Sequence, residues 1–285
     1  METKFSVLMS VYKNDKADQV KLALESIYDN QTLKPNEIVL VFDGPVGQEL
    51  EQTVEEFEKV CPVLKVVKQP ENLGLGKTLN NGLTYCTNEL VARMDSDDIS
   101  MPTRFEKQIS VFQNGDYDIV GTNISEFCDD PNNIISVRVV PEKQEDIVKF
   151  MKSRTPFSHV TVMFKKSMVE KAGGYQHLYY CEDYYLWVRM YLAGAKMYNI
   201  QENLVNVRMN MEAFGRRGGI KFYKSHKTLF KFMRKNKIIG FGTYLKNCLI
   251  RFTAEVLMTN NMRKKFYIKH LRKTKELENN GASEN

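Results

Sequence analysis

The sequence predicts an α/β protein with a mixed, mainly parallel sheet flanked by helices and a basic helical extension at its C-terminus. Short apolar runs without polar alternation recur early in the chain, which is typical of parallel strands covered on both faces. Helical stretches of about 10–15 residues separate these runs, as in βαβ units. Residues 221–285 contain 16 Lys and Arg against 4 Asp and Glu, a net charge of +12, whereas 1–220 carry −6. We therefore predict a main domain over 1–220 and an extension over 221–285.

The first third of the chain alternates strands and helices. The run "FSVLMSV" (5–11) predicts a buried strand, and Asn14 or Asp15 could cap a helix that ends near Tyr28. Further strands are predicted at 37–44, 64–68 and 89–94, and helices at 47–60 and 76–86.

Past residue 115 the spacing changes, and the sheet is expected to become mixed. Strand-like runs with short connections occupy 118–123, 134–140 and 159–164. An aromatic helix over 183–193 is followed by a strand at 195–200. Basic amphipathic helices are predicted at 219–236 and 243–275, before a frayed tail.

Composition indicates a cytoplasmic protein with free thiols. No apolar run approaches the roughly 20 residues that span a bilayer, and no signal peptide is evident at the start. The five cysteines are scattered without a CxxC pair, which favours a reducing compartment.

Acidic residues gather where predicted strands end. In open α/β sheets, ligands bind beyond the carboxyl ends of the strands, where this chain carries Asp43 and the run Asp95, Ser96, Asp97, Asp98. Converging carboxylates need a cation, and oxygen ligands suit Mg²⁺ or Mn²⁺, with substrate phosphates completing the shell. Asp98, which precedes "ISMP", fits turn and helix-cap chemistry equally well.

Two further segments carry candidate chemistry. In "ENLGLGKTLNNGL" (71–83), Gly74 and Gly76 allow close backbone approach and Lys77 could meet phosphate; a glycine-rich turn before a helix is the alternative. The segment lacks the spacing of a Walker loop and of GxGxxG. In "YYCEDYYLWVRMYLAG" (179–194), Glu182 and Asp183 either stabilise the helix dipole or supply a general base.

In their order and rough spacing, these segments resemble family 2 glycosyltransferases of the GT-A fold. The likeness covers 5–219 and rests on "SVYKND", "IVLVFDG", "NLGLGKTLNNGL", "RMDSDDISMPTRFEKQ", "HVTVMFKKS", "GGY" and "EDYYLWVRM". The branch it resembles builds bacterial capsule, exopolysaccharide and O-antigen. It implies inverting hexosyl transfer from a nucleotide sugar, by resemblance a UDP-sugar, with Mn²⁺ or Mg²⁺, to a saccharide acceptor that is lipid-linked.

The resemblance also implies roles for single residues. Val11 and Tyr12 would border the nucleotide base, and Asp43 would accept a hydrogen bond from it. The 72–82 loop would face the nucleotide, and Asp183 would be the general base, with Glu182 beside it. The remaining nucleotide-sugar contacts would be Gly74, Lys77, Asn80, Asp95 and Ser96, and the metal would be held by Asp97 with Asp95.

The chain departs from the family pattern at two places. Leu79 stands where many members carry an arginine, so Lys77 could cover part of that role. No histidine follows the strand past residue 200, and Arg208, Arg216 and Arg217 could hold the diphosphate instead. His159 is placed near the acceptor, with a hydrogen-bonded core histidine as the alternative.

The basic extension has two interpretations. Basic residues interleaved with apolar ones favour an anionic membrane surface, here the inner face of the plasma membrane where a lipid-linked acceptor would lie. The alternative is a helical cap with a solvated basic face. A non-catalytic scaffold or nucleic-acid-binding protein is a rival class, but no nucleic-acid motif accompanies the extension and the acidic part repels phosphates, so no nucleic acid is expected. A nucleotidyltransferase is a second rival, which would release pyrophosphate rather than nucleoside diphosphate.

Overall fold

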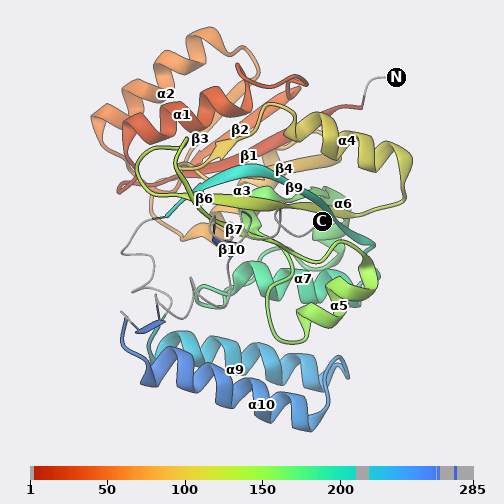
Figure 1. The fold of residues 1–285 in the computed structure, drawn as a ribbon. Coiled ribbons are helices and arrows are strands. Elements are labelled where there is room, and N and C mark those ends of the chain that lie inside the picture. Colours follow the sequence, from red (N-terminus) through yellow and green to blue (C-terminus); the bar gives the residue numbers. More distant parts are fainter. Residues whose placement is uncertain (1–2, 210–217, 261, 264–272, 275–285) are drawn as a thin grey trace, which may run out of the picture.

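The computed structural model describes residues 3–209, 218–260, 262–263 and 273–274. Over these residues the chain is built on one ten-stranded mixed sheet (Figure 1). The strand order is β10, β7, β6, β8, β4, β1, β2, β3, with β9 paired to β6 and β5 paired to β9. The strands are β1 Phe5–Val11, β2 Glu37–Phe42, β3 Leu64–Lys68, β4 Leu90–Met94, β5 Ile99–Ser100, β6 Ile119–Phe127, β7 Ile134–Arg138, β8 Met163–Lys165, β9 Met197–Arg208 and β10 Lys273–Thr274.

Helices cover both faces of the sheet, and two more form a separate layer at the bottom of Figure 1. The helices are α1 Ala17–Ile27, α2 Gln48–Val60, α3 Leu75–Tyr85, α4 Arg104–Asn114, α5 Gln144–Met151, α6 Lys166–Lys171, α7 Glu182–Leu192, α9 Ile220–Lys235 and α10 Phe241–Phe252. Side chains of α1, α2 and α4 pack on one face, and those of α3 and α7 pack on the other. The predicted architecture is confirmed.

The parallel half consists of β3, β2, β1 and β4, as the unalternating apolar runs predicted. Residues of β1 are buried on both sides, with Val7 and Met9 facing α1 and Leu8 facing α3. A Cβ added at Gly82 of α3 would lie 2.5 Å from Leu8 Cδ1. This glycine therefore lets α3 lie close against the sheet.

The mixed half is centred on β6, all of whose residues are buried. β8 runs antiparallel to both β4 and β6, whereas β9 runs parallel to β6. The predicted strand over 159–164 is wrong in its first half, because Ser158 O accepts hydrogen bonds from the Thr161 amide and hydroxyl and closes a 3₁₀ turn at His159–Thr161. The strand predicted at 195–200 continues to Arg208, since it keeps pairing with β6.

Helix α4 was not predicted, because its buried face includes polar side chains that interrupt the apolar periodicity. Arg104 Nη2 donates to the Arg93 carbonyl at 2.7 Å, and the Gln108 amide donates to the carbonyls of Val120 and Thr161 at 2.9 Å each. These contacts fasten α4 beneath β4 and β6. The short helices α5 and α6 were also missed.

The basic extension forms a helical hairpin that packs against the main domain. The buried face of α9 joins Met151 of α5 and Tyr184 and Val188 of α7 in one apolar cluster. α10 buries only Asn247, whose side chain donates to the Lys152 carbonyl at 2.7 Å. A capping role is therefore part of the structure, although the proposed domain boundary at residue 220 stays a prediction.

The helix predicted over 243–275 is interrupted after α10 and does not reach its predicted end, whereas its residues 261, 264–272 and 275 lie outside those that the structure describes. α10 ends at Phe252, and a π-helical turn over Thr253–Leu257 ends at an extended Met258. The Arg263 guanidinium donates to the carbonyls of Ala254 and Glu255 at 3.0 Å each, which satisfies groups that a continuing helix would have used. Lys273–Thr274 is a strand that pairs with β7. Within the described residues, no helix is both long enough and apolar enough to cross a bilayer.

Candidate active site

The candidate site lies beyond the carboxyl ends of β2, β1 and β4, which are neighbours in the sheet. The chain passes from β1 to β2 and β3 on one side and returns to β4 on the other, so β1 and β4 form a topological switch point. Open α/β sheets bind their ligands at such points. The loops after β1 and β4 are therefore expected to carry the binding groups.

Asp15 joins the loops after β1 and β4. Its Oδ2 accepts the Tyr12 amide at 3.0 Å and the Ser96 hydroxyl at 2.7 Å. Burial raises the pKa of Asp15 to about 6, against the lowering effect of these two hydrogen bonds. The prediction that Asn14 or Asp15 caps α1 is wrong, because the N-cap is Lys16 and the Asp15 carboxylate is engaged with the loops.

Asp43, directly after β2, holds the glycine-rich loop in place. Its Oδ1 accepts the Leu73 amide at 2.7 Å, and its Oδ2 accepts the Gly74 amide at 3.1 Å. Gly44 has φ +83°, and a Cβ there would lie 2.6 Å from the Asn72 amide nitrogen. The Asp43 amide in turn donates to the Val11 carbonyl at 2.8 Å. If a nucleotide base binds Asp43 as predicted, it would bind a carboxylate that also accepts hydrogen bonds from the glycine-rich loop.

The loop continues into α3, which touches the segment before α7. A Cβ added at Gly76 would lie 3.4 Å from Glu182 Cγ. Asn80 forms two hydrogen bonds of 2.7 Å with the backbone of Tyr175, one to the amide and one to the carbonyl. Asn80 thus fastens α3 to Tyr175, while Lys77 is exposed on the first turn of α3.

The three aspartates after β4 occupy different environments. Asp95 is partly exposed and forms an ion pair with the buried Arg93. Asp97 is partly exposed, and burial, followed by the charges of Asp95 and Asp15, raises its pKa to about 6. Asp98 is buried and accepts the Arg208 amide at 2.7 Å. Asp98 therefore acts within the fold, and Asp97 faces like charges that a cation would relieve.

The carboxylates available for a metal ion are few among the described residues. Within the described parts of the chain, no three His, Cys, Asp or Glu side chains gather closely enough to enclose a metal ion. Asp95 and Asp97 instead fit the sparse type of Mg²⁺ or Mn²⁺ site, in which one or two carboxylates are completed by water and substrate phosphates. The chemistry of these oxygen donors suits such an ion.

Arg208 secures the aspartate loop. Its Nε donates to the Asp97 carbonyl at 3.2 Å, and its guanidinium lies 4.6 Å from the centre of the Phe127 ring. The predicted diphosphate contact would have to be made from this position. Arg216 and Arg217, the other two predicted contacts, lie outside the described residues.

The second acidic pair, Glu182 and Asp183, opens α7. Burial raises the pKa of both carboxyls, and a hydrogen bond from the Tyr184 amide, followed by the charges of Arg138 and Arg93, partly lowers the pKa of Asp183. His159 Nε2 lies 2.8 Å from the Tyr175 hydroxyl, and burial followed by the charge of Arg93 lowers the pKa of His159 well below its usual range. His159 is therefore a neutral hydrogen-bonded side chain beside the site.

The sequence matches the model of glycosyl transferase family 2 over residues 6–173, more than half of the chain. The chain belongs to glycosyltransferase family 2. It is 39% identical to the amylovoran biosynthesis glycosyltransferase AmsE of Erwinia amylovora, over 83% of this chain and 88% of that protein. It is 37% identical to an Escherichia coli UDP-Gal:α-D-GlcNAc-diphosphoundecaprenol β-1,3-galactosyltransferase, over 90% of this chain and 93% of that protein.

Solved structures support the fold of this family 2 glycosyltransferase. S. aureus TarS 1–349 in complex with UDP-GlcNAc aligns with a TM-score of 0.65 at 16% identity, covering 94% of this chain and 76% of that one. The GT-A fold predicted from the sequence is thereby confirmed.

Two residues of the glycosyltransferase site were missed by sequence reasoning. Arg93 is 1% exposed, and its Nε and Nη1 have no hydrogen-bond partner among the described residues. Asp15 follows β1 as Asp43 follows β2, so its place at a strand end was the available signal. Arg93 gave no such signal, since it lies inside an apolar strand.

Asp98→Ala is expected to destabilise the glycosyltransferase without removing nucleotide binding. The change leaves the Arg208 amide without its buried acceptor, which costs about 1–3 kcal/mol of unfolding free energy. Thermal unfolding and UDP titration with Mn²⁺ measure the two effects, with Lys59→Ala, at an exposed position on α2, as the control. A normal melting temperature together with lost UDP binding would move Asp98 into the metal site.

Proposed function

We propose that this glycosyltransferase transfers a hexose from a UDP-sugar to a saccharide acceptor in one inverting displacement. The observation that carries the proposal is that the glycine-rich loop joins the strand ends to the acids that open α7. Asp43, directly after β2, accepts the Leu73 amide of this loop at 2.7 Å. A Cβ added at Gly76 of the same segment would lie 3.4 Å from Glu182 Cγ, so the donor-side loops and the candidate bases border one another.

Donor binding is assigned to the loops after β1, β2 and β4. Tyr12 and Asp43 would border the base, and Asp95 the ribose. Asp97 with Asp95 would hold Mn²⁺ or Mg²⁺, which would supply positive charge for the diphosphate. The type of these oxygen donors supports the assignment, as does the pKa of Asp97, which burial and then the charges of Asp95 and Asp15 raise to about 6.

Asp183 is assigned as the general base. The acceptor oxygen forms a bond to the anomeric carbon while the bond from that carbon to the diphosphate breaks, and UDP leaves with the electron pair. The hydroxyl proton passes to Asp183. Burial raises the pKa of Asp183, which brings its basicity nearer to the operating pH. Glu182, beside it, is the second candidate.

The acceptor is proposed to be a lipid-linked saccharide at the inner face of the plasma membrane. The galactosyltransferase relative is named for a diphosphoundecaprenol acceptor, and the polar head of such a lipid lies at the bilayer surface. On α10, Phe241, Leu245 and Leu249 are exposed at a helical spacing of four. The Arg234 guanidinium lies 4.7 Å from the centre of the Phe241 ring. Further exposed basic side chains of the hairpin are Lys231, Lys235, Lys237 and Lys246. Apolar and basic groups together fit an anionic bilayer surface.

Leu249→Glu is expected to weaken binding to vesicles that contain phosphatidylserine. Leu249 is 68% exposed, and its burial in a bilayer contributes about 1.5–3 kcal/mol, so at least a tenfold loss of binding is expected. Vesicle co-sedimentation at low and high salt measures the effect. Val60→Glu is the matched control, because Val60 is 67% exposed on α2. Unchanged binding of Leu249→Glu would leave the hairpin as a cap alone.

The function is tested by incubation with single nucleotide sugars, Mn²⁺ and a GlcNAc-diphospho-lipid. UDP-galactose, UDP-glucose, UDP-GlcNAc and GDP-mannose form the donor panel. The proposal expects acceptor-dependent release of UDP from one UDP-sugar and an inverted anomeric linkage in the product. Release of pyrophosphate would indicate nucleotidyl transfer, and no release from any donor would favour a non-catalytic scaffold.

A further inference from the structure

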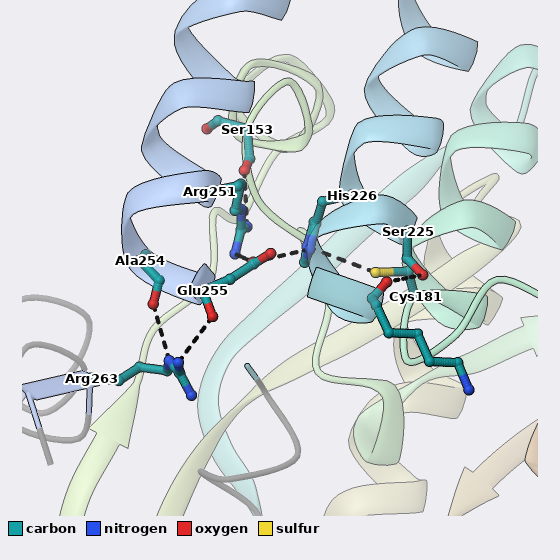
Figure 2. Close-up of polar contacts among 9 residues, drawn as sticks. Ser153, Cys181, Ser225, His226, Arg251, Ala254, Glu255 and Arg263 are labelled. Carbon is teal, nitrogen blue, oxygen red and sulfur yellow. Dashed lines mark hydrogen bonds and ion pairs between the residues drawn. The ribbon is translucent and has the colours of Figure 1, made fainter. Parts of the chain in front are cut away.

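A buried polar chain connects the C-terminal hairpin to the turn that precedes Glu182 and Asp183 (Figure 2). His226 of α9 places Nε2 3.8 Å from Cys181 Sγ and Nδ1 3.1 Å from Glu255 Oε1. Cys181, His226 and Glu255 are each less than 5% exposed. These polar contacts therefore connect the hairpin to Cys181, the residue directly before the two candidate general bases, Glu182 and Asp183.

The turn that receives this chain is strained. Tyr180 has φ +53°, in the left-handed region that a tyrosine rarely adopts. The first turns of α9 hold the turn along its length: Lys221 Nζ lies 3.9 Å from the centre of the Tyr179 ring, and the Phe222 ring lies 6.4 Å from that of Tyr180. A strained backbone conformation persists only where the surrounding contacts hold it in place, and such conformations cluster at functional sites.

The other end of the chain is anchored to the main domain. Arg251 Nη1 lies 3.2 Å from Glu255 Oε1, and Arg251 Nη2 donates to the Ser153 carbonyl, which follows α5, at 3.2 Å. The Glu255 carbonyl accepts the Gly219 amide at 2.7 Å, at the start of α9. Figure 2 shows the side chains of His226 and Arg251 both pointing toward Glu255. Glu255 is thus fixed from three segments.

The protonation states of His226 and Cys181 decide which group donates and which accepts in each of these contacts. Burial, followed by the charge of Arg251, lowers the pKa of His226 to about 4, so its ring is neutral at neutral pH. A neutral imidazole has one N–H and one acceptor nitrogen. Because Nδ1 lies nearest to the Glu255 carboxylate, we place the N–H on Nδ1, and Nε2 is then the acceptor nitrogen that faces the Cys181 thiol. Burial raises the pKa of Cys181 well above its usual range, so the thiol keeps its proton.

We propose that His226 and Glu255 are positioning residues for the general base, acting through Cys181 on the start of α7. An interface that only needed to adhere would be served by apolar side chains, which α9 already supplies around Leu229 and Met233. The polar chain instead fixes the turn from Tyr179 to Cys181 and so aims the carboxylate of Asp183. The inference rests on the proposed role of Asp183.

His226→Asn and His226→Gln separate positioning from simple adhesion. The Asn amide takes the place of Nδ1 and keeps the Glu255 contact but cannot reach Cys181, whereas Gln reaches toward Cys181. We expect His226→Asn and Cys181→Ala to lower kcat about tenfold or more, with the KM for the UDP-sugar that the donor panel identifies and the affinity for UDP with Mn²⁺ within about twofold. His226→Gln and Cys181→Ser should recover a large part of kcat.

Ile239→Ala is the matched control. Ile239 is 5% exposed in the same apolar cluster as Leu229 and Met233 but is no part of the polar chain. It should lower the melting temperature and leave kcat unchanged below that temperature. If Ile239→Ala lowers kcat as much as His226→Asn does, or if His226→Asn leaves kcat unchanged, the positioning role is overturned.

Hydrogen–deuterium exchange gives a result that does not depend on turnover. His226→Asn should speed amide exchange over residues 178–184, and Ile239→Ala should not. Unchanged exchange in His226→Asn contradicts the inference even if activity falls. A wild-type protein that transfers no sugar refutes the proposed function instead, and the exchange result still decides whether the chain holds the turn.

Discussion

Asp183→Asn is expected to lower transfer by roughly 10²-fold or more while UDP binds as tightly as before. The amide keeps the shape of the side chain but cannot accept the acceptor's proton. Donor groups after β1, β2 and β4 are untouched, so the UDP complex with Mn²⁺ should persist. Titration calorimetry with UDP and a coupled assay of UDP release measure the two quantities.

The pH profile provides a second measurement for the same assignment. Burial raises the pKa of Asp183, and the base must be unprotonated to act. The rate of the wild-type enzyme should therefore fall as the pH is lowered through a value above the usual pKa of an aspartate. Glu182→Gln is the control, and it should retain most of the activity. Near-normal transfer by a folded Asp183→Asn protein would make Glu182 the base.

Asp97→Ala is expected to remove the metal dependence of UDP binding. Loss of one charged partner costs roughly 1.5–3 kcal/mol, so UDP affinity with Mn²⁺ should fall about tenfold to 10²-fold. Without metal, the variant and the wild type should bind UDP equally. Because Asp97 is partly exposed and lies among like charges, its removal should not lower the melting temperature.

Asp95→Ala provides the contrast to this result. Asp95 is the ion-pair partner of the buried Arg93, so its loss leaves an unpaired buried charge and should destabilise the protein. Of these two variants, only Asp97→Ala is expected to weaken metal-dependent UDP binding without lowering the melting temperature. Equal UDP affinity of Asp97→Ala and wild type in the presence of Mn²⁺ would refute the metal assignment.

Residues that follow buried strands could be predicted from the sequence, because position and residue type suffice there. Asp43 and Asp97 are of this kind, whereas the acids that open α7 were proposed from their place at the start of a helix. The same rule applied to the residues after β1 would have indicated Asp15, whose chemistry was instead assigned to a helix cap. The role of Asp43 in shaping the glycine-rich loop needed the coordinates, since the loop lies about thirty residues away in the chain.

Buried polar side chains were the main source of error. Helix α4 was missed because the buried polar side chains of Arg104 and Gln108 interrupt its apolar face. Arg93 was missed because it is a single charged residue inside the apolar strand β4. Arg104 and Gln108 are buried with partners outside α4, namely the Arg93 carbonyl for Arg104 and the Val120 and Thr161 carbonyls for Gln108. The contact between His226 and Glu255 has the same character. Such pairs depend on the tertiary fold, which residue patterns along the chain do not encode.

The pairing of β6 with β9 sets the order in which this protein can fold. β1 to β4 lie within the first 94 residues, so that half of the sheet can assemble early during synthesis. β6 cannot complete its hydrogen bonds until Met197 to Arg208 have left the ribosome, since Ile119 pairs with Met197 and Phe127 with Arg208. Until then, one edge of this fully buried strand stays open, and the growing chain is most exposed to aggregation in that interval.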